Sequence, residues 1–559
     1  MFRGTDRLGS TDHFDLIRQT GGECNAATSF DTTHYFQTLP ANQLDLALWL
    51  EAERMSFLAV NQEHFDTERK VVEEELRQGR DGPYGTLADQ VLEALFTVHP
   101  YRWTPGGKIA HLRSAAVQEL RDFWQHYYVP NNATLVIVGA VSHDQAQQAA
   151  RQYFGWIPRG DDPPRVTIRE PLPTAARQVT FKEKNAPTPL VGLLYRTVPA
   201  GHPDQIPLDL LATILGGGES SRIYRDLVAE SQAVTFAVAA SLSLQQDGIF
   251  GVGAVLPPFG GKPGKEVLER MLTHVERLRS EPVTERELTK ARNQMLAQIV
   301  ARNLTVETKA TVLAQAAVVE GDVAGVNRTL DDVRAVTADD LLRVAREYLA
   351  PERVMQGTVE RNLLGTLLGA RDKTDDGAVT AEPETEAPPP GRPGVVRPDN
   401  YPTKPPIAGP LESAPAPAVT TRMLPNGLKV MVVPNHEVPY VTIELGLLTG
   451  GFADAKPGTA PLALAMLTKG TATHTEGELA EELETYAISL GGNATLDYAA
   501  VSAGCLTEQL ERAMGFLAEV VRTPTFPAEE FDKLRNQVRT GMTIREQQPE
   551  YLADRQLRR

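Results

Sequence analysis

The sequence has few cysteines, no long apolar run and no excess of positive charge. Cys24 and Cys505 are the only cysteines in 559 residues, which excludes a disulfide framework. No apolar run reaches the length of a membrane span, and the N-terminal residues contain no signal-peptide core. The net charge of −16 argues against nucleic acid as the main partner and leaves neutral or basic polypeptides open.

Length and composition favour a multidomain globular protein. A chain of 559 residues exceeds one hydrophobic core, and 42% hydrophobic residues suffice for ordinary packing. Mixed helical and strand patterns predict the α/β (α+β) class. We expect a first domain at 1–160, a second domain at 165–361, a Pro/Ala/Glu-rich extended linker at 370–419 and a third domain at 420–559.

Hydrophobic periodicity predicts the main elements of each domain. In the first domain it predicts helices over 12–20, 42–58, 87–96, 116–128 and 144–154, a strand pair or one long strand over 23–36, and a buried strand over 133–139. In the second domain it predicts strands near 178–182, 190–195, 233–242 and 249–255, and helices over 207–215, 264–280 and 284–303. An Asn426-Gly427 turn predicts a hairpin at the start of the third domain.

The stretch from Glu68 to Arg77 predicts an acidic helix, capped at Asp66 or Thr67 and ended by Gly79 or by Gly82-Pro83. Because Glu68 and Glu75 are seven residues apart, they lie near one face. Such carboxylates are either solvated or hold a cation, and the solvated alternative is the commoner one. Glu73 and Glu74 are expected to be solvated.

Two other features have structural explanations. The glycine run before Glu219 lacks the Lys-Ser/Thr of a phosphate loop, so we expect a turn that opens a helix. Four histidines show no ligand spacing with one another and are assigned to loops or the core: His34, His64, His99 and His126.

The third domain repeats the first. Residues 1–5 resemble 467–471, residues 21–26 resemble 491–494, and residues 65–69 resemble 531–535, with an offset of 466 at both ends and small length differences that cancel between them. The third domain has residues 420–466 ahead of its matching start. We therefore expect the first domain to be truncated at its N-terminus, and the chain to be an interior piece of a longer protein.

The two copies differ in their acids. Glu68 corresponds to Leu534 and Glu75 to Gly541. Packing needs neither pattern, so a working copy and a non-working copy would explain the difference.

Several motifs in order resemble the pitrilysin/insulinase family of zinc peptidases, the inverzincins. They are Phe2-Arg3-Gly4-Thr5, Gly21-Gly22 with Asn25-Ala26 and Thr28, Glu68-Arg69-x-Val71-Val72-x-x-Glu75, Tyr127-Tyr128-x-Pro130-Asn131-Asn132-Ala133, Leu215–Arg222 and Leu424–Leu428. The resemblance implies repeated peptidase-type domains, each an antiparallel-rich sheet packed with helices, in two halves around a chamber. It also leaves a homo-oligomer open.

The resemblance also implies a chemistry. In that family an HxxEH helix supplies two ligands of one zinc ion and a general base, and a downstream Glu completes the site. Glu75 matches the third metal ligand. Glu68 matches a second catalytic-site acid in the outer shell. Asn25, Ala26 and Thr28 match a strand edge that pairs with a peptide or unfolded polypeptide substrate.

The sequence departs from the family where the HxxEH helix should lie, just before residues 1–5. In the third domain the matching stretch, Pro461–Ala465, has no ligand residue. We therefore expect a zinc metalloendopeptidase that is inactive as given and does not bind catalytic zinc tightly. The alternative is a non-catalytic processing or scaffold subunit that binds peptides. By analogy with fused bacterial members, the intact parent is expected to be periplasmic or exported.

Overall fold

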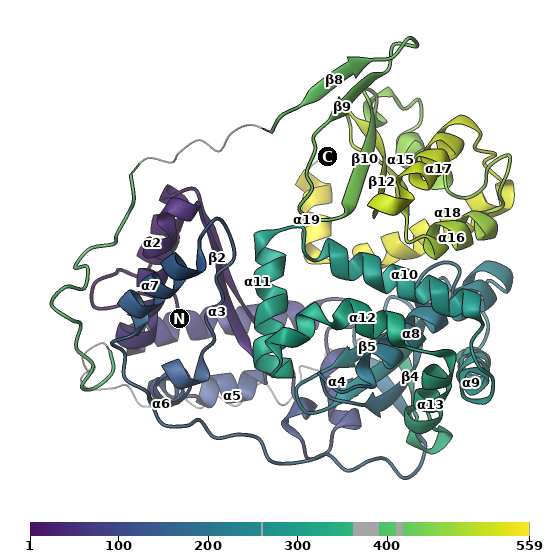
Figure 1. The fold of residues 1–559 in the computed structure, drawn as a ribbon. Helices are drawn as coiled ribbons and strands as arrows, with labels where there is room; N and C mark the ends of the chain where they lie inside the picture. The colour runs from purple at the N-terminus through teal and green to yellow at the C-terminus, as the bar shows by residue number, and fades with distance from the viewer. Residues whose placement is uncertain (259–260, 362–390, 410–416, 558–559) are drawn as a thin grey trace.

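The computed structural model describes residues 1–258, 261–361, 391–409 and 417–557, and they form helices packed on small sheets (Figure 1). All strand pairs in this part are antiparallel except β3–β7. The predicted α/β (α+β) class with antiparallel-rich sheets is confirmed. No helix in the described ranges is long and apolar enough to cross a bilayer.

The first domain begins with a hairpin and three helices: α1 (Asp12–Gln19), β1 (Glu23–Thr28), β2 (Thr33–Thr38), α2 (Leu44–Phe57) and α3 (Gln62–Asp81). Further helices follow as α4 (Leu87–Leu95), α5 (Ile109–Ser114), α6 (Val117–Tyr127) and α7 (His143–Phe154). The predicted helices over 12–20, 87–96, 116–128 and 144–154 are confirmed to within two residues. Trp49 of α2 is fully buried in a cluster with Ile17 and Tyr153.

The acidic helix α3 begins five residues earlier than predicted. Asn61 is its cap, since its side chain accepts the amide of His64 at 2.9 Å, so the predicted cap at Asp66 or Thr67 is wrong. The helix continues through Gly79 and ends at Gly82. The result is a 20-residue helix that carries the whole Glu68–Glu75 pattern on one rigid element.

The predicted buried strand over 133–139 is wrong. These residues have no strand pairing, and the side chain of Leu135 is 47% exposed. A β-branched apolar run becomes a strand only when neighbouring strands satisfy its backbone groups. The hairpin of this domain pairs β1 with β2, and residues 133–139 are not part of that sheet.

The second domain is built on a five-stranded sheet of order β3-β7-β4-β6-β5. Its strands are β3 (Arg177–Glu183), β4 (Leu190–Thr197), β5 (Phe236–Ser243), β6 (Gly248–Val255) and β7 (Met355–Arg361). Its helices include α8 (Gln205–Gly216), η4 (Tyr224–Glu230), α9 (Gly264–Ser280), α10 (Glu285–Ala301), α11 (Val306–Gln315), α12 (Thr329–Ala335) and α13 (Ala338–Tyr348). The strands and helices predicted here from periodicity are confirmed.

Successive side chains of β4 point to opposite faces of the sheet, and each face packs in a different hydrophobic cluster. Val191, Leu193 and Tyr195 belong to the cluster formed with α8, α9, α10 and α13. The opposite face of the sheet packs against α4 of the first domain, where Leu92 and Leu95 join Phe181, Met355 and Val359. The chain segment after α3 therefore anchors the acidic helix to the second domain's sheet.

Residues 391–409, which we call the strap, contain no helix or strand and pack on the first domain. The Arg392 guanidinium donates to the carbonyl of Gln125 at 2.7 Å. The Arg397 guanidinium pairs with Asp6 and with the fully buried Glu53. Tyr401 is 5% exposed. Thus residues 391–409 of the predicted linker lack helix and strand but are docked on the first domain, while linker residues 370–390 and 410–416 lie outside the described residues.

The third domain begins with the hairpin of β8 (Thr420–Met423) and β9 (Lys429–Val432), which projects at the top of Figure 1 and confirms the predicted turn. The remaining elements are β10 (Tyr440–Leu447), α15 (Thr459–Met466), α16 (Glu476–Thr485), β11 (Ser489–Ala494), β12 (Ala499–Leu506), α17 (Leu510–Arg522), α18 (Ala528–Arg545) and α19 (Pro549–Leu557). The sheet has the order β10-β12-β11.

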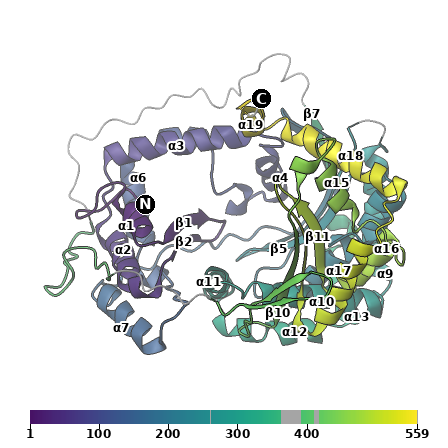
Figure 2. The ribbon, with the colours of Figure 1, turned by 90° about the horizontal axis from the view of Figure 1, so that it is seen from above.

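The internal repeat extends from the hairpin to the long helix with one constant offset of 466. The elements β1, β2, α2 and α3 begin at residues 23, 33, 44 and 62, and β11, β12, α17 and α18 begin at 489, 499, 510 and 528. An isolated bridge joins Thr5 to Leu58 in one copy and Thr471 to Pro524 in the other. The two copies lie on opposite sides of the molecule (Figure 2).

The constant offset corrects the predicted match of Gly21-Gly22 with Gly491-Gly492. Gly21, with φ +78°, follows α1 as Ala487, with φ +51°, follows α16. The next amides, of Gly22 and Ile488, close the same helix-ending turn. Gly491 and Gly492 instead lie in β11 at the places of Asn25 and Ala26. The left-handed residue that ends each helix, Gly21 or Ala487, fixes the alignment of the two domains, although the residue types alone do not reveal it. With this alignment the two copies have no length differences over these elements.

Candidate functional site

Helix α3 presents Glu68 and Glu75 in different environments. The Nε of Arg3 donates to Oε1 of Glu68 at 2.5 Å, and both side chains are partly exposed. Glu75 is exposed, and among the described residues it has no hydrogen-bond or ion-pair partner. The carboxylate of Glu75 is therefore free to bind a cation, whereas that of Glu68 is already balanced by a guanidinium.

Glu73 fixes α3 against the following segment. Arg113 of α5 pairs with Glu73 at 2.7 Å, and Arg77 pairs with it from the same helix. The hydrogen bond from Arg113 lowers the pKa of Glu73. The expectation that Glu73 is simply solvated is wrong, because α5 supplies a cation that the helix pattern does not show. Glu74 is exposed as expected.

The hairpin that carries Asn25, Ala26 and Thr28 lies on the same side of the molecule as α3 in Figure 2. In the described part of the chain β1 pairs with β2 alone, so its other edge has no partner strand. Oδ1 of Asn25 accepts the amide of Ala26 at 2.8 Å. An edge strand of this kind can accept an added peptide strand through its backbone groups.

The hairpin is anchored at two places. On β2, the Tyr35 hydroxyl lies 2.6 Å from that of Tyr128, and Arg54 stacks over the Tyr35 ring at 3.8 Å. At the hairpin turn, Asp31 accepts the Tyr101 hydroxyl at 2.5 Å and the Gln245 amide at 3.0 Å. These contacts hold the edge strand to both the first and the second domain.

The N-terminal motif packs against the same side chains, Tyr35 and Arg54, that hold the hairpin. The ring of Phe2 lies 5.7 Å from that of Tyr35 and 4.9 Å from that of His13, and Arg54 stacks on it. Burial, together with the positive charge of Arg54, lowers the pKa of His13 to about 4. Sequence reasoning did not single out His13 or Arg54, because both lie outside the Phe2–Thr5 motif.

The assignment of four histidines to loops or the core holds for His99 but is wrong for His34 on β2, His64 on α3 and His126 on α6, none of which is buried. His64 contacts its cap Asn61, His126 bonds the carbonyl of Asp122, and His99 is buried beside Tyr101. Within the described ranges, no three His, Cys, Asp or Glu side chains come together as a metal site.

The residues present do not fit a catalytic zinc ion as they stand. Such an ion takes three protein ligands and leaves a fourth position for water. Here Glu75 is one free carboxylate, Glu68 is bound to Arg3, and the sequence has no HxxEH.

In the third domain, the positions equivalent to Arg3 and Glu68 lie against the second domain. Lys469 stands at the place of Arg3 and Leu534 at the place of Glu68. Both line a very small cavity that Tyr224 of the second domain also lines. This copy therefore faces the second domain where the first copy presents its acids.

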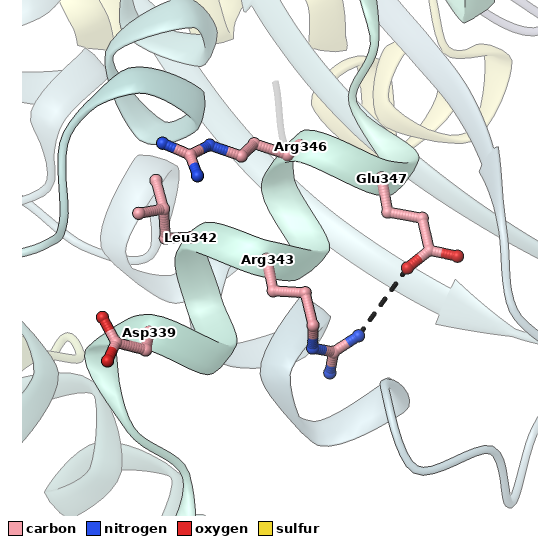
Figure 3. Close-up of a pocket in the computed structure, with 5 residues that line it drawn as sticks. All are labelled: Asp339, Leu342, Arg343, Arg346 and Glu347. Atoms are coloured by element: carbon pink, nitrogen blue, oxygen red, sulfur yellow. Dashed lines mark ion pairs between the residues drawn. The ribbon is translucent and has the colours of Figure 1, made fainter.

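A larger hollow lies along α13 and is open to solvent (Figure 3). One helix supplies all of its lining: Asp339, Leu342, Arg343, Arg346 and Glu347. Arg343 pairs with Glu347 at 3.7 Å and with the buried Asp204 at 2.5 Å. These are structural ion pairs, and the hollow contains none of the predicted site residues.

Comparison with known proteins settles the family. Residues 1–104 and 429–559 match the model described as Insulinase (Peptidase family M16), and residues 114–295 match the Peptidase M16 inactive domain. The chain belongs to the insulinase family of peptidases. The predicted resemblance is confirmed.

Relatives and solved structures that the chain resembles cover different shares of its length. The zinc protease PqqE of Helicobacter pylori is 29% identical over 353 residues, covering 62% of this chain and 78% of the relative. The zinc protease Rv2782c of Mycobacterium tuberculosis is 27% identical over 352 residues, covering 63% and 80%.

Among solved structures, a protease from Helicobacter pylori has a TM-score of 0.61 and 28% identity, and the match covers 64% of this chain and 87% of that one. The periplasmic protease PqqL from Escherichia coli has a TM-score of 0.55 and 15% identity. That match covers 99% of this chain and 64% of PqqL, which supports the fold.

Proposed function

We propose that this M16 chain binds peptides or unfolded polypeptides along β1, and that Glu75 is the third zinc ligand of a metalloendopeptidase site. The 559-residue chain does not complete that site and does not hydrolyse peptides by itself. The observation that carries the proposal is the unpaired Glu75 carboxylate on α3, seven residues from Glu68 in the domain that also carries the edge strand. The relatives' names as zinc proteases support the choice of metal.

The proposed roles follow from the contacts of each side chain. In a completed site, Glu75 would be one of three protein ligands of the ion, which would supply Lewis-acid chemistry for peptide hydrolysis. Arg3 neutralises and orients Glu68, which suits an outer-shell acid better than a ligand. Asn25, Ala26 and Thr28 lie on β1, whose free edge would pair with the substrate backbone.

We also propose that the chain consists of three domains, at 1–160, 165–361 and 420–559, and that residues 370–419 link the second domain to the third. The printed description of PqqL as periplasmic supports an exported location for a bacterial relative of this kind.

Peptide binding and hydrolysis are separated by one experiment on the purified chain. Binding of a fluorescent unfolded polypeptide is measured by anisotropy, and turnover of quenched peptides is measured with added zinc. We expect binding without turnover, and loss of binding in Ala26→Pro. The matched control is Gly492→Pro at the same place on β11. Chelator-sensitive turnover by the unmodified chain would contradict the proposal.

The second candidate is a non-catalytic scaffold subunit, favoured by the loss of both acids in the third domain at Leu534 and Gly541. The discriminating chain carries an added HxxEH helix ahead of Met1. Zinc-dependent turnover in that chain supports the peptidase, and its absence with peptide binding retained supports the scaffold.

A further inference from the structure

The glycine-rich turn of the second domain holds a carboxylate from the third domain. Oε1 of Glu484 accepts the amide of Glu219 at 2.7 Å and that of Ser220 at 3.3 Å, and Oε2 accepts the Ser220 hydroxyl. The ammonium group of Lys290, which is nearly buried, lies 4.0 Å from Oε2 and also donates to Ser220. One carboxylate thus receives two amides, a hydroxyl and a nearby positive charge.

The backbone of the turn is shaped for this carboxylate. Gly218 has φ +112°, in the region that favours glycine. A Cβ at this position would lie 2.4 Å from Oε1 of Glu484. The absence of a side chain therefore makes room for the carboxylate as well as permitting the turn.

In a second ion pair across the same interface, the third domain supplies the positive charge and the second domain supplies the carboxylate. The ammonium group of Lys469 in the third domain lies 2.5 Å from Oε1 of Glu219 and 3.3 Å from Oε1 of Glu476. Its side chain is 13% exposed. The turn therefore receives a carboxylate and offers one in return, which fixes both the position and the polarity of the contact.

The repeat explains why the third domain and not the first can fill this turn. At the constant offset Arg18 stands at the place of Glu484, so the first domain would bring a guanidinium to two amides and Lys290. Arg3, at the place of Lys469, is already bound to Glu68. Leu534 replaces that acid in the third domain, which leaves Lys469 to pair with Glu219.

Contacts along α10 extend the interface between the second and third domains, but they do not explain why the third domain is bound there in place of the first. Asn293 donates to the carbonyl of Thr485 at 2.8 Å, and Arg286 lies 3.1 Å from Glu481. The first contact uses a backbone oxygen that any residue supplies. The second has a counterpart in the first domain, where Asp15 stands at the place of Glu481. Selection therefore rests on Glu484 and Lys469.

We propose that the Gly216–Ser221 turn and Lys290 form a carboxylate receptor that selects the third domain as the second domain's partner. In this account the third domain is a docking module, and Leu534, at the place of the lost acid Glu68, serves the interface. The proposal does not depend on Glu75 being a zinc ligand.

The test uses the folded full chain with a protease site inserted after Glu412, nicked after purification. Association of the two parts is followed by gel filtration and by hydrogen exchange of the Glu219 and Ser220 amides. Glu484→Arg should weaken association by about tenfold or more, because charge-assisted hydrogen bonds are replaced by like charges. Exchange of both amides should accelerate to a similar extent.

The matched control is Glu508→Arg, a charge reversal at an exposed position of the same domain. It should leave association and exchange unchanged. Circular dichroism and the unfolding midpoint show whether each variant is folded. A folded, nicked Glu484→Arg variant that associates as tightly as the unmodified chain, with both amides still protected, would overturn the proposal. Glu484→Gln should fall between the two, since an amide keeps the shape and loses the charge.

Discussion

The first and third domains share a backbone plan but use it in opposite ways. From the hairpin to the long helix their elements begin 466 residues apart, with the same bridge and the same helix-ending turn. In the first domain Arg3 binds Glu68 and Glu75 is left unpaired. In the third domain Lys469 and Glu484 bind the second domain instead. A few charged positions therefore separate a candidate metal site from a docking surface.

The largest expected effect concerns Glu75 in a chain that carries an added HxxEH helix ahead of Met1. Glu75→Gln should abolish most peptide turnover, because a neutral amide is a poor substitute for a charged ligand. The loss should exceed the roughly 10–100-fold typical of an outer-shell residue. Peptide turnover at one pH is the measurement. A Glu74→Gln loss as large as that of Glu75→Gln would show that the register of α3 is misassigned.

How much the sequence predicts depends on how local each feature is. Helix α3 and the Glu68–Glu75 spacing follow from local periodicity, as does the Asn426-Gly427 hairpin. The cap at Asn61 escapes the pattern because nine residues, all polar except Phe65, separate it from the apolar stripe that begins at Val71. The strand predicted over 133–139 failed because a strand needs a partner, and partners are not local.

Features that join distant segments were beyond sequence reasoning. Nothing in the Pro-rich composition indicates that Arg397 reaches Asp6 and Glu53, or that Tyr401 is buried. The pairing of Arg3 with Glu68 spans 65 residues. The match of glycine pairs between copies was misleading, because the equivalent of Gly21 is a left-handed alanine.

The strap provides the next test of the comparison, on stability. Glu53 is fully buried and depends on Arg397, whereas its counterpart Glu519 is held within its own domain by His474 and Thr471. Arg397→Met leaves the Glu53 charge uncompensated and should destabilise the first domain by about 3–5 kcal/mol.

Urea unfolding followed by the fluorescence of Trp49 and Trp124 measures this change. Arg422→Met, at an exposed position, is the control. Equal stability of the two variants would show that Arg397 contributes nothing to the stability of the first domain.

A third difference is sensitivity to acid. The folded-state pKa of His13 is about 4, below its ordinary value of 6.5, so unfolding takes up a proton in this range. Stability should be full above pH 6.5 and decline as the pH falls toward 4, by at most about 3 kcal/mol. Leu479 occupies this place in the third domain, so His13→Leu should remove this part of the decline. Urea unfolding at pH 7.5, 5.5 and 4.5 measures it, and an unchanged slope would contradict the assignment.

The smallest expected effect concerns Glu68 in the chain with the added helix. Glu68→Gln should lower turnover by roughly 10–100-fold, as an outer-shell acid does. Arg3→Met should act in the same direction, since it removes the cation that orients Glu68. A loss in Glu68→Gln as complete as in Glu75→Gln would make Glu68 a direct ligand.

Zinc content measures the contrast between the two copies most directly. The chain with the added HxxEH helix, its Glu75→Gln variant and its Gly541→Glu variant are purified in parallel, and bound zinc is quantified by mass spectrometry. We expect one zinc ion per chain, lost in Glu75→Gln and unchanged at one in Gly541→Glu, since the third domain has no other ligand. Full zinc in Glu75→Gln would contradict the assignment of the metal site to the first domain.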